Sequence, residues 1–228
     1  MTGGALEHFR HFHTCPRCGA TADEPNRVVP FRCAHCGFVL FFNAAAAVAV
    51  FVRREDGHAL FVRRARDPGR GQLGLPGGFA DFGETAEEAT RRETREEVGL
   101  ELGDLTYLAS FPNVYVYAGV TYHTLDIFFV AATKGTETPR ALDAVDSVCW
   151  IDPMTVDLEE IAFPSMRSAV LELRQVAGAS CLSASAELRH PSEARGQVCL
   201  LPLKPMALEL QRPAVLGHGA DDLIRSAV

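Results

Sequence analysis

The sequence contains very little lysine and no long apolar run. Of its 22 basic residues only Lys134 and Lys204 are lysines, which we interpret as coding bias rather than function. No apolar run is long enough to cross a bilayer, and the N-terminal stretch lacks the apolar core of a secretory signal peptide. We therefore expect a cytoplasmic protein that has no membrane partner.

The sequence also lacks an excess of basic charge. Its net charge is −7 and its pI is about 5.6, which argues against binding nucleic acid by general electrostatic attraction. At 228 residues, the chain is long enough for one substantial domain and a small one. We therefore expect no nucleic-acid partner.

Four of the seven cysteines are arranged as two Cys-x-x-Cys-Gly motifs, Cys15/Cys18 and Cys33/Cys36, separated by 14 residues. Four thiolates brought together in this way favour a tetrahedral zinc ion. A reducing cytoplasm disfavours a disulfide pair, and the doubled motif disfavours a redox Cys-x-x-Cys. Because cysteine would fill all four positions, we expect a structural zinc ribbon over residues 13–42.

The remaining cysteines and the first histidines carry weaker signals. Three cysteines have no paired spacing, and we expect them to behave as small hydrophobic residues. They are Cys149, Cys181 and Cys199. Three histidines precede the ribbon, where we favour a polar lead-in over a metal site. They are His8, His11 and His13.

A helix is predicted from Thr85 to Gly99. The hydroxyl of Thr85 can cap the first free N–H groups while Glu88 reaches back to complete a capping box. Gly99 can adopt the left-handed conformation that ends a helix. Between them no proline or glycine interrupts the run, so helical spacing applies throughout.

Three glutamates share one face of this predicted helix. Relative to Glu93, Glu97 lies at about +40° and Glu96 at about −60°. Such close carboxylates repel one another, so a positive charge should lie among them. Arg92 and Arg95 could supply part of it, but a hard divalent cation with oxygen ligands fits better. Taken alone, the pattern is also compatible with a solvated charged face.

The sequence before the helix favours the ligand site. Residues 75–79, Leu-Pro-Gly-Gly-Phe, predict a strand end and a glycine turn whose backbone can approach a ligand closely. From Gly78 to Leu100 the chain resembles the Nudix box at every charged and glycine position. The matching residues are Gly78, Glu84, Arg92, Glu93, Arg95, Glu96, Glu97, Gly99 and Leu100. Thr94 departs from the usual aliphatic residue but has a similar volume to valine.

The Nudix resemblance implies roles for the box residues. It implies a catalytic group made of Glu93, Glu97, Arg92 and Glu84. It further implies that Mg²⁺ or Mn²⁺ is held by Glu93, Glu96 and Glu97, with the carbonyl of Gly78 as a further ligand. Either Glu93 or Glu97 would serve as base, and Arg92 would orient the carboxylates by ion pairing.

The rest of the chain predicts an α/β fold. A hairpin is predicted from residues 41–52 and 59–62, further strands over 102–111, 114–117, 122–132 and 148–151, and helical segments over 158–161 and 166–176. The resemblance identifies this as a Nudix α/β/α sandwich with a mixed sheet over residues 43–176. Residues 177–228 form a C-terminal extension, either a loosely ordered tail or a segment packed on the domain.

Further residues are candidates for substrate binding. Arginines after the hairpin could contact phosphate, and aromatic residues after the box could stack on a base, although surface arginines and core aromatics are the common alternatives. Nudix members often carry another acidic residue downstream, and two aspartates before the last strand are the best candidates. The substrate-binding candidates are Arg63, Arg64, Phe111, Tyr122, Asp143 and Asp146.

The resemblance implies hydrolysis of a nucleoside diphosphate linked to another group. A zinc ribbon before a Nudix domain is similar to the arrangement in NADH pyrophosphatases, but their proline- and tryptophan-rich signature is absent from residues 110–115. ADP-ribose is therefore as good a candidate as NADH, and a homodimer is a possible assembly. The alternative is a ligand-sensing regulator whose ribbon binds nucleic acid, but Arg17, Arg27 and Arg32 are its only basic residues.

Overall fold

A computed structural model describes residues 13–21 and 30–187 of the chain, with side chains to residue 178. Within this part the first small sheet consists of β1 (Phe31–Arg32) and β2 (Val39–Leu40). A six-stranded sheet follows, with α1 (Ala86–Val98), η2 (Leu158–Glu160) and α2 (Pro164–Glu187). Its strands are β3 (Ala45–Arg53), β4 (Ala59–Arg64), β5 (Leu73–Gly74), β6 (Thr106–Tyr117), β7 (Val120–Ala132) and β8 (Val145–Ile151).

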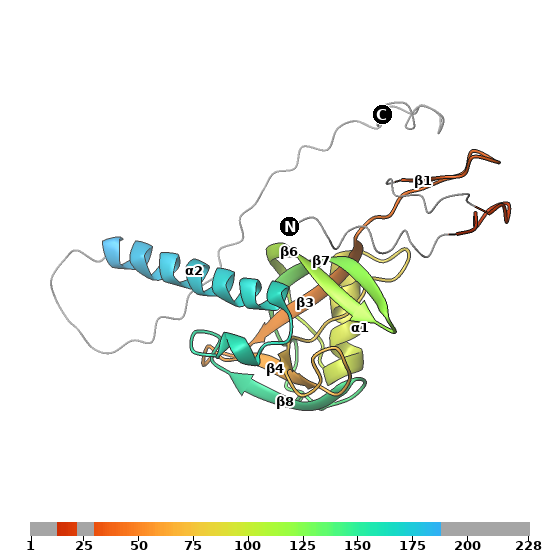
Figure 1. The fold of residues 1–228 in the computed structure, drawn as a ribbon. Helices are drawn as coiled ribbons and strands as arrows, with labels where there is room; N and C mark the ends of the chain where they lie inside the picture. Colours follow the sequence, from red (N-terminus) through yellow and green to blue (C-terminus); the bar gives the residue numbers. More distant parts are fainter. Residues whose placement is uncertain (1–12, 22–29, 188–228) are drawn as a thin grey trace, which may run out of the picture. The chain divides into compact units, whose positions relative to one another are not determined.

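The large sheet is mixed and lies between the two helices (Figure 1). Its strand order is β5-β4-β3-β7-β6, with β8 paired to β4. The central pair β3–β7 is parallel, whereas β6–β7, β4–β5 and β4–β8 are antiparallel. This arrangement confirms the predicted α/β sandwich with a mixed sheet.

Alternation along β3 explains why both faces of the sheet are covered. Val50 and Val52 pack with Ala89 and Val98 of α1. Phe51, between them in sequence, packs on the opposite face with residues of α2. Because successive side chains of a strand point to opposite faces, a continuous apolar run such as this one serves two cores. The helices are thereby fixed on opposite sides of the sheet.

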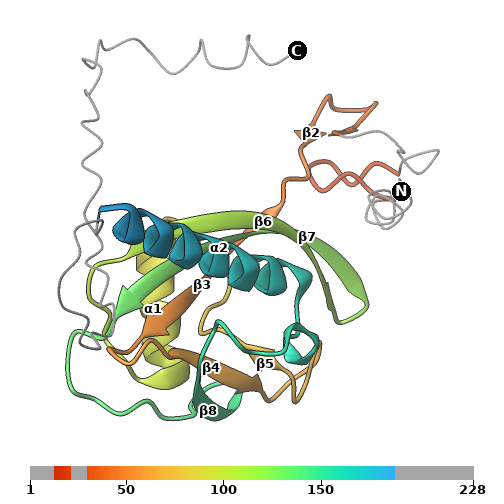
Figure 2. The same cartoon turned by 90° about the vertical axis from the view of Figure 1, so that its left-hand side faces the viewer.

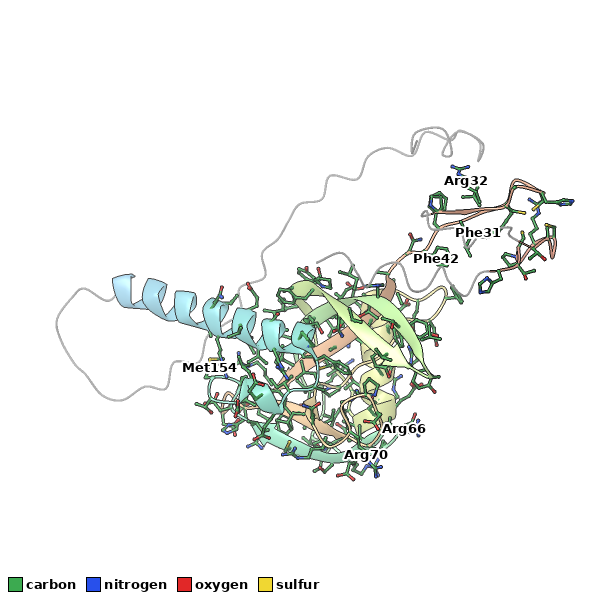
Figure 3. The ribbon with its side chains drawn as sticks, viewed as in Figure 1. Phe31, Arg32, Phe42, Arg66, Arg70 and Met154 are labelled. Carbon is green, nitrogen blue, oxygen red and sulfur yellow. The ribbon has the colours of Figure 1, made fainter. Side chains whose placement is uncertain are left out.

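The ribbon has a small core of its own. The buried residues Cys15, Phe31 and Cys33 form its centre, and Phe42 packs against them. Figure 3 labels Phe31 and Phe42 within this segment. The packing of Phe42 explains why β3 begins at Ala45 rather than at residue 41, as predicted from the apolar run.

Other element boundaries differ from the predictions for physical reasons. Residues 106–117 form one strand rather than two, because Pro112 lies in β6, an edge strand where a missing N–H is tolerated. Arg63 and Arg64 belong to β4 and do not open the following loop. The last helix extends to Glu187, well past the predicted end at residue 176, and residues 158–160 form a 3₁₀ turn.

Parts of the sequence discussed above lie outside the described residues. They are His8, His11, Arg27, Cys199, the side chain of Cys181 and residues 188–228 of the predicted extension. Among the helices that the structure describes, none combines the length and apolar character that a bilayer span requires.

Candidate metal centre and carboxylate cluster

The four cysteines of the ribbon converge on one point. Their sulfur atoms all lie within 4.8 Å of one another, with 3.8 Å between Cys15 and Cys36 and 3.7 Å between Cys18 and Cys33. Zinc–sulfur bonds of about 2.3 Å in a tetrahedron place the sulfurs about 3.8 Å apart. The two shorter sulfur–sulfur distances match this value, and the whole set lies close enough together for the four thiolates to hold one zinc ion.

The backbone around the cysteines favours thiolates. The N–H groups of Gly19 and Gly37 donate to the carbonyls of Cys15 and Cys33, closing each turn. The N–H of Cys36 donates to the sulfur of Cys33, and this contact lowers the pKa of the Cys33 thiol to about 6. The backbone contact with Ala20 lowers the pKa of the Cys18 thiol, but burial and the neighbouring sulfurs together raise it to about 12, so Cys33 is the thiol of this pair that is biased toward the thiolate that zinc binds.

Helix α1 begins and ends as the sequence predicts. Thr85 accepts from the N–H of Glu88, and the Glu88 side chain accepts from the N–H of Thr85, at 3.1 and 2.7 Å. Gly99 ends the helix with φ 69°, and its N–H donates to the carbonyl of Arg95. Thr94 is fully buried and donates its hydroxyl to the Thr90 carbonyl at 2.7 Å, so its polarity is satisfied inside the packing. The glutamate face is therefore held by well-defined helix ends.

The glycine pair before the helix lies where side chains would clash. A Cβ atom on Gly77 would lie 2.0 Å from the Val48 carbonyl oxygen, and its φ of 153° disfavours other residues. A Cβ atom on Gly78 would lie 2.6 Å from the carboxylate of Glu93. The loop backbone therefore contacts both the central strand and the glutamate face of α1.

Arg92 is the hub of the acidic cluster. Its guanidinium lies 2.6 Å from Glu84, 2.8 Å from Glu93 and 3.1 Å from Glu96, and it donates to the carbonyl of Phe79 at 3.0 Å. These contacts keep its pKa well above the usual range and lower that of Glu84. The guanidinium has five N–H donors in a fixed plane, which lets it orient several carboxylates at once.

Glu97 lies deeper, apart from Arg92. Its side chain accepts from the N–H of Gly77 at 3.0 Å. Burial raises its pKa to about 8, and the neighbouring Glu93 charge adds to that effect. Burial also raises the pKa of Glu93. Glu93 has the Arg92 guanidinium beside it, whereas Glu97 has no ion-pair partner among the described residues, so a nearby cation would favour its ionised form.

The carboxylates do not form a finished coordination shell. We compared the histidine, cysteine, aspartate and glutamate side chains in the described parts of the chain. Among them, only the four cysteines form a group of three or more whose ligand atoms lie close enough together to hold one metal ion. Glu96 is half exposed and turns to Arg92, whereas Glu97 faces the loop. The carbonyl of Gly78 accepts from Val48 at 2.8 Å, which leaves one lone pair. The donors are nevertheless carboxylate and carbonyl oxygens, which are the ligands that a hard divalent cation prefers.

The arginines proposed for phosphate binding are partly engaged. Arg63 donates to the carbonyl of Gly71 and lies 3.4 Å from Glu160. Arg64 donates to the Pro68 carbonyl, and its positive charge partly offsets the rise in the pKa of Glu97. Arg66 and Arg70 follow in the loop after β4 (Figure 3).

The two downstream aspartates differ in their surroundings. Asp143 is exposed, lies 3.3 Å from Arg66, and contributes to raising the pKa of Glu97. Asp146 is exposed within β8 rather than before that strand. Asp143 is therefore the one with an electrostatic connection to the cluster.

The aromatic candidates also separate. Phe111 is partly buried and packs against the core, 6.2 Å from the ring of Phe128. Tyr122 is 41% exposed and lies opposite Tyr115 across the β6–β7 pair. Tyr122 is therefore the more accessible of the two, and Phe111 has a packing role against the core.

A buried polar cluster was not predicted. The carboxylate of Asp126 accepts from Thr124 at 2.6 Å, Asn113 at 3.0 Å and Ser165 at 2.6 Å, and all four residues are buried. The cluster connects β6 and β7 to the first turn of α2. Its partners are scattered along the sequence, so local patterns could not reveal it.

Comparison with known proteins identifies the family. Residues 43–173 match the NUDIX domain, and the chain belongs to the Nudix family. The capped helix and the acidic face described above are the segment that carried the resemblance in sequence.

Curated relatives match part of the chain. It is 32% identical over 114 residues to "NAD-capped RNA hydrolase NudC" of Haemophilus influenzae strain PittGG, covering 48% of this chain and 42% of that protein. It is 33% identical over 110 residues to "ADP-ribose pyrophosphatase" of Methanocaldococcus jannaschii, covering 47% and 62%. The chain thus spans less than two thirds of the length of these relatives.

A solved structure supports the fold. "NUDIX hydrolase from Nitrosomonas europaea" superimposes with a TM-score of 0.52 at 21% identity, covering 71% of this chain and 88% of that one. At this level of identity, the likeness concerns the arrangement of sheet and helices alone.

Proposed function

We propose that the protein is a divalent-metal-dependent hydrolase that cleaves the pyrophosphate of a nucleoside diphosphate linked to another group. The observation that carries this proposal is the position of the partly buried Glu97 and Glu93 beside the Gly77–Gly78 backbone, where Glu97 accepts from the N–H of Gly77 and Glu93 lies against Gly78. Glu97 has no ion pair among the described residues and lies beside a closely approaching backbone, and such an arrangement is suited to a cation that also binds phosphate.

The residues proposed to hold Mg²⁺ or Mn²⁺ are Glu93, Glu96 and Glu97, with the Gly78 carbonyl as a further ligand. When bound, such an ion neutralises charge on phosphate oxygens and lowers the pKa of a coordinated water. Arg92 restrains Glu93 and Glu96 through its ion pairs, and Glu84 anchors Arg92 from the other side. Arg92 and Glu84 are thus positioning residues in this proposal.

The proposed reaction consumes one water. Its oxygen bonds to one phosphorus of the diphosphate, and the bond from that phosphorus to the bridging oxygen breaks. The proton released by the water goes to a carboxylate oxygen of Glu93 or Glu97. The leaving phosphate carries away the electron pair of the broken bond, with its charge stabilised electrostatically.

The relatives' names suggest the substrate class. "NAD-capped RNA hydrolase" and "ADP-ribose pyrophosphatase" both describe a diphosphate attached to a nucleoside. We propose the same chemical class here. We also propose that the ribbon of residues 13–42 holds a structural zinc and that residues 43–176 form the hydrolase domain.

The test is a substrate panel with and without magnesium. Wild-type protein is incubated with NADH, ADP-ribose, diadenosine polyphosphates and nucleoside triphosphates, and the products are identified. Glu97→Gln removes charge at nearly constant shape and should lower kcat by at least about a hundredfold, since a charged ligand and base candidate is lost. Glu87→Gln, on the exposed part of the same helix, is the matched control.

Two outcomes would contradict the proposal. Normal turnover by Glu97→Gln would contradict the assignment of Glu97 to the catalytic site. A wild-type protein that binds nucleotides without releasing phosphate-containing products, and binds DNA with strong salt dependence, would instead be a ligand-sensing regulator.

A further inference from the structure

Arg64 is held in place near the box loop without an ion pair. Its Nε–H donates to the carbonyl of Pro68 at 2.8 Å, and its guanidinium lies over the Phe163 ring, with 4.7 Å between the guanidinium carbon and the ring centre. Within the described residues, no carboxylate pairs with Arg64 and no acceptor takes the N–H groups of its two terminal nitrogens. The guanidinium is therefore fixed in orientation while four of its five N–H donors stay available.

The neighbouring arginine, Arg63, is engaged with protein groups instead. It donates to the Gly71 carbonyl at 2.9 Å, and it lies 3.4 Å from the carboxylate of Glu160. A substrate anion would have to compete with both partners for its N–H groups. Of these two adjacent arginines, Arg64 is thus the one whose donors are open to a ligand.

The ring of Phe163 is itself fixed by its chain neighbours. The N–H of Ala162 donates to the carbonyl of Leu73 in β5 at 2.9 Å, and the hydroxyl of Ser165 donates to the buried carboxylate of Asp126 at 2.6 Å. Figure 2 shows the segment between η2 and α2 lying beside β5. Because the backbone is held on both sides of it, the buried Phe163 ring is a rigid surface.

The side chain of Arg64 adjoins the segment that leads into the box loop. A Cβ atom on Gly74 would lie 3.6 Å from its Cγ, so the stem of the side chain passes over this residue of β5. Gly74 precedes Gly77 by three residues, a stretch that spans at most about 11 Å. The N–H of Gly77 donates to Glu97 at 3.0 Å. Arg64 and Glu97 thus adjoin the two ends of one short segment.

Resting on the proposed function, we propose that Phe163 is a positioning residue for Arg64, and that Arg64 binds an anionic oxygen of the substrate's diphosphate. A guanidinium matches two phosphate oxygens only when its plane is correctly oriented, and an aromatic ring beneath the guanidinium sets that plane. The ring is uncharged and accepts none of the N–H groups in its plane. Phe163 therefore orients Arg64 without competing with the substrate, as a carboxylate partner would.

The proposal predicts an effect on binding rather than on the chemical step. A phosphate oxygen is charged both in the bound substrate and in the transition state, so Arg64 stabilises both states. Losing an interaction of this kind raises KM and leaves kcat nearly unchanged. A residue that only maintained the fold would have no such selective effect.

The test measures KM and kcat separately in excess magnesium, with ADP-ribose and NADH as substrates. Phe163→Leu keeps an apolar side chain but removes the ring, and it should raise KM about three- to tenfold with kcat within about twofold of wild type. Arg64→Ala should raise KM at least as much. In the double variant Arg64→Ala/Phe163→Leu, KM should equal that of Arg64→Ala, because the ring acts only through the arginine.

Two further variants separate positioning from packing. Phe163→Tyr retains the aromatic face and should restore the KM of wild type. Phe128→Leu removes a ring from the same hydrophobic core, one that packs against Phe111 rather than against Arg64, and it should leave KM unchanged. All variants are assayed at a temperature at which circular dichroism shows them to be folded.

The inference fails if Phe163→Leu raises KM as much in the Arg64→Ala background as in wild type, because the ring would then act by another route. It also fails if Phe163→Leu and Phe128→Leu change KM equally, or if Phe163→Leu lowers kcat and leaves KM unchanged.

A wild-type protein that hydrolyses no substrate of the panel would overturn the proposed function itself. Calorimetry with inorganic pyrophosphate and magnesium then decides the inference separately. A weaker affinity of Phe163→Leu than of wild type and Phe128→Leu would support a diphosphate site at Arg64, whereas equal affinities would overturn it.

Discussion

At the scale of single residues, Arg92 and Glu97 divide the acidic cluster between them. Arg92 compensates Glu84, Glu93 and Glu96, but Glu97 receives only a backbone N–H from Gly77 as a direct partner among the hydrogen bonds found. Three of the four glutamates of this cluster are thus compensated by Arg92, and the fourth, Glu97, has a raised pKa. Such a group costs stability when it is ionised without a cation.

This cost predicts a pH-dependent difference in stability. The pKa of Glu97 is about 8 in the folded protein, against 4.5 as its reference value. A raised carboxyl pKa means that the folded state is favoured while Glu97 is protonated, and this stability is lost as the pH rises from about 4.5 to about 8. In EDTA at pH 8.5, the free energy of unfolding of Glu97→Gln should therefore exceed that of wild type by a few kcal/mol, and its Tm should be higher. At pH 4 the two proteins should be equally stable.

The comparison has an internal control. Glu87→Gln changes an exposed residue of the same helix and should follow wild type at both pH values. Adding magnesium should raise the Tm of wild type more than that of Glu97→Gln. Equal melting temperatures of wild type and Glu97→Gln at pH 8.5 in EDTA would show that the pKa of Glu97 is not raised in the folded protein.

At the scale of elements, the Asp126 cluster connects helix α2 to the sheet. Its carboxylate accepts from Asn113 of β6, Thr124 of β7 and Ser165 of α2. Asp126→Ala leaves three buried donors without their acceptor, so we expect the free energy of unfolding to fall by about 3 kcal/mol or more. The measurement is urea unfolding, with attention to whether the m-value changes.

Asp104→Ala is the matched control for this prediction. Asp104 is exposed, and its truncation should change the free energy of unfolding by no more than about 0.5 kcal/mol. Asp126→Asn keeps an acceptor oxygen and should fall between the two. A free energy of unfolding in Asp126→Ala equal to that of Asp104→Ala would mean that solvent readily replaces the carboxylate.

The elements show which structure could be predicted from sequence. Thr85, Glu88 and Gly99 define the ends of α1 through contacts within a few residues, so local patterns were sufficient. The two-residue strand β5 and the far end of α2 carry too little local signal. The positions of Arg63 and Arg64 depend on pairing with β8, which no local pattern contains.

The candidate site shows the same division. The spacing of Glu93, Glu96 and Glu97 predicted a shared helix face, but it could not predict that Arg92 would hold two of them. The partners of Asp126 lie 13 and 39 residues away in sequence at Asn113 and Ser165, and only the assembled sheet brings them together.

At the scale of the whole molecule, the ribbon has a core and a metal-ligand set of its own. Its buried residues and four cysteines are separate from the two cores of the sheet. We therefore expect zinc loss to unfold the ribbon while the carboxylate site keeps its chemistry.

The corresponding experiment uses the full chain. Cys15→Ser should abolish zinc binding and expose the ribbon to limited proteolysis, with kcat/KM in excess magnesium within about twofold of wild type, because metal binding and ribbon folding are coupled. Cys149→Ser, outside the cluster, should retain zinc. Complete loss of turnover in Cys15→Ser, with the sheet intact by circular dichroism, would show that catalysis needs the ribbon.

The parallel pairing of β3 with β7 also bears on how the chain assembles. Ala45 pairs with Thr124, so the middle of the sheet joins segments that lie far apart in the sequence, whereas β6 and β7 meet through a two-residue turn. Local hairpins close in microseconds, but distant pairings must first overcome the entropy of a large loop. The β6–β7 hairpin can therefore form early. The apolar strand β3 is synthesised before β7 and cannot pair with it until β7 has been made, and during that time β3 is exposed and prone to aggregate.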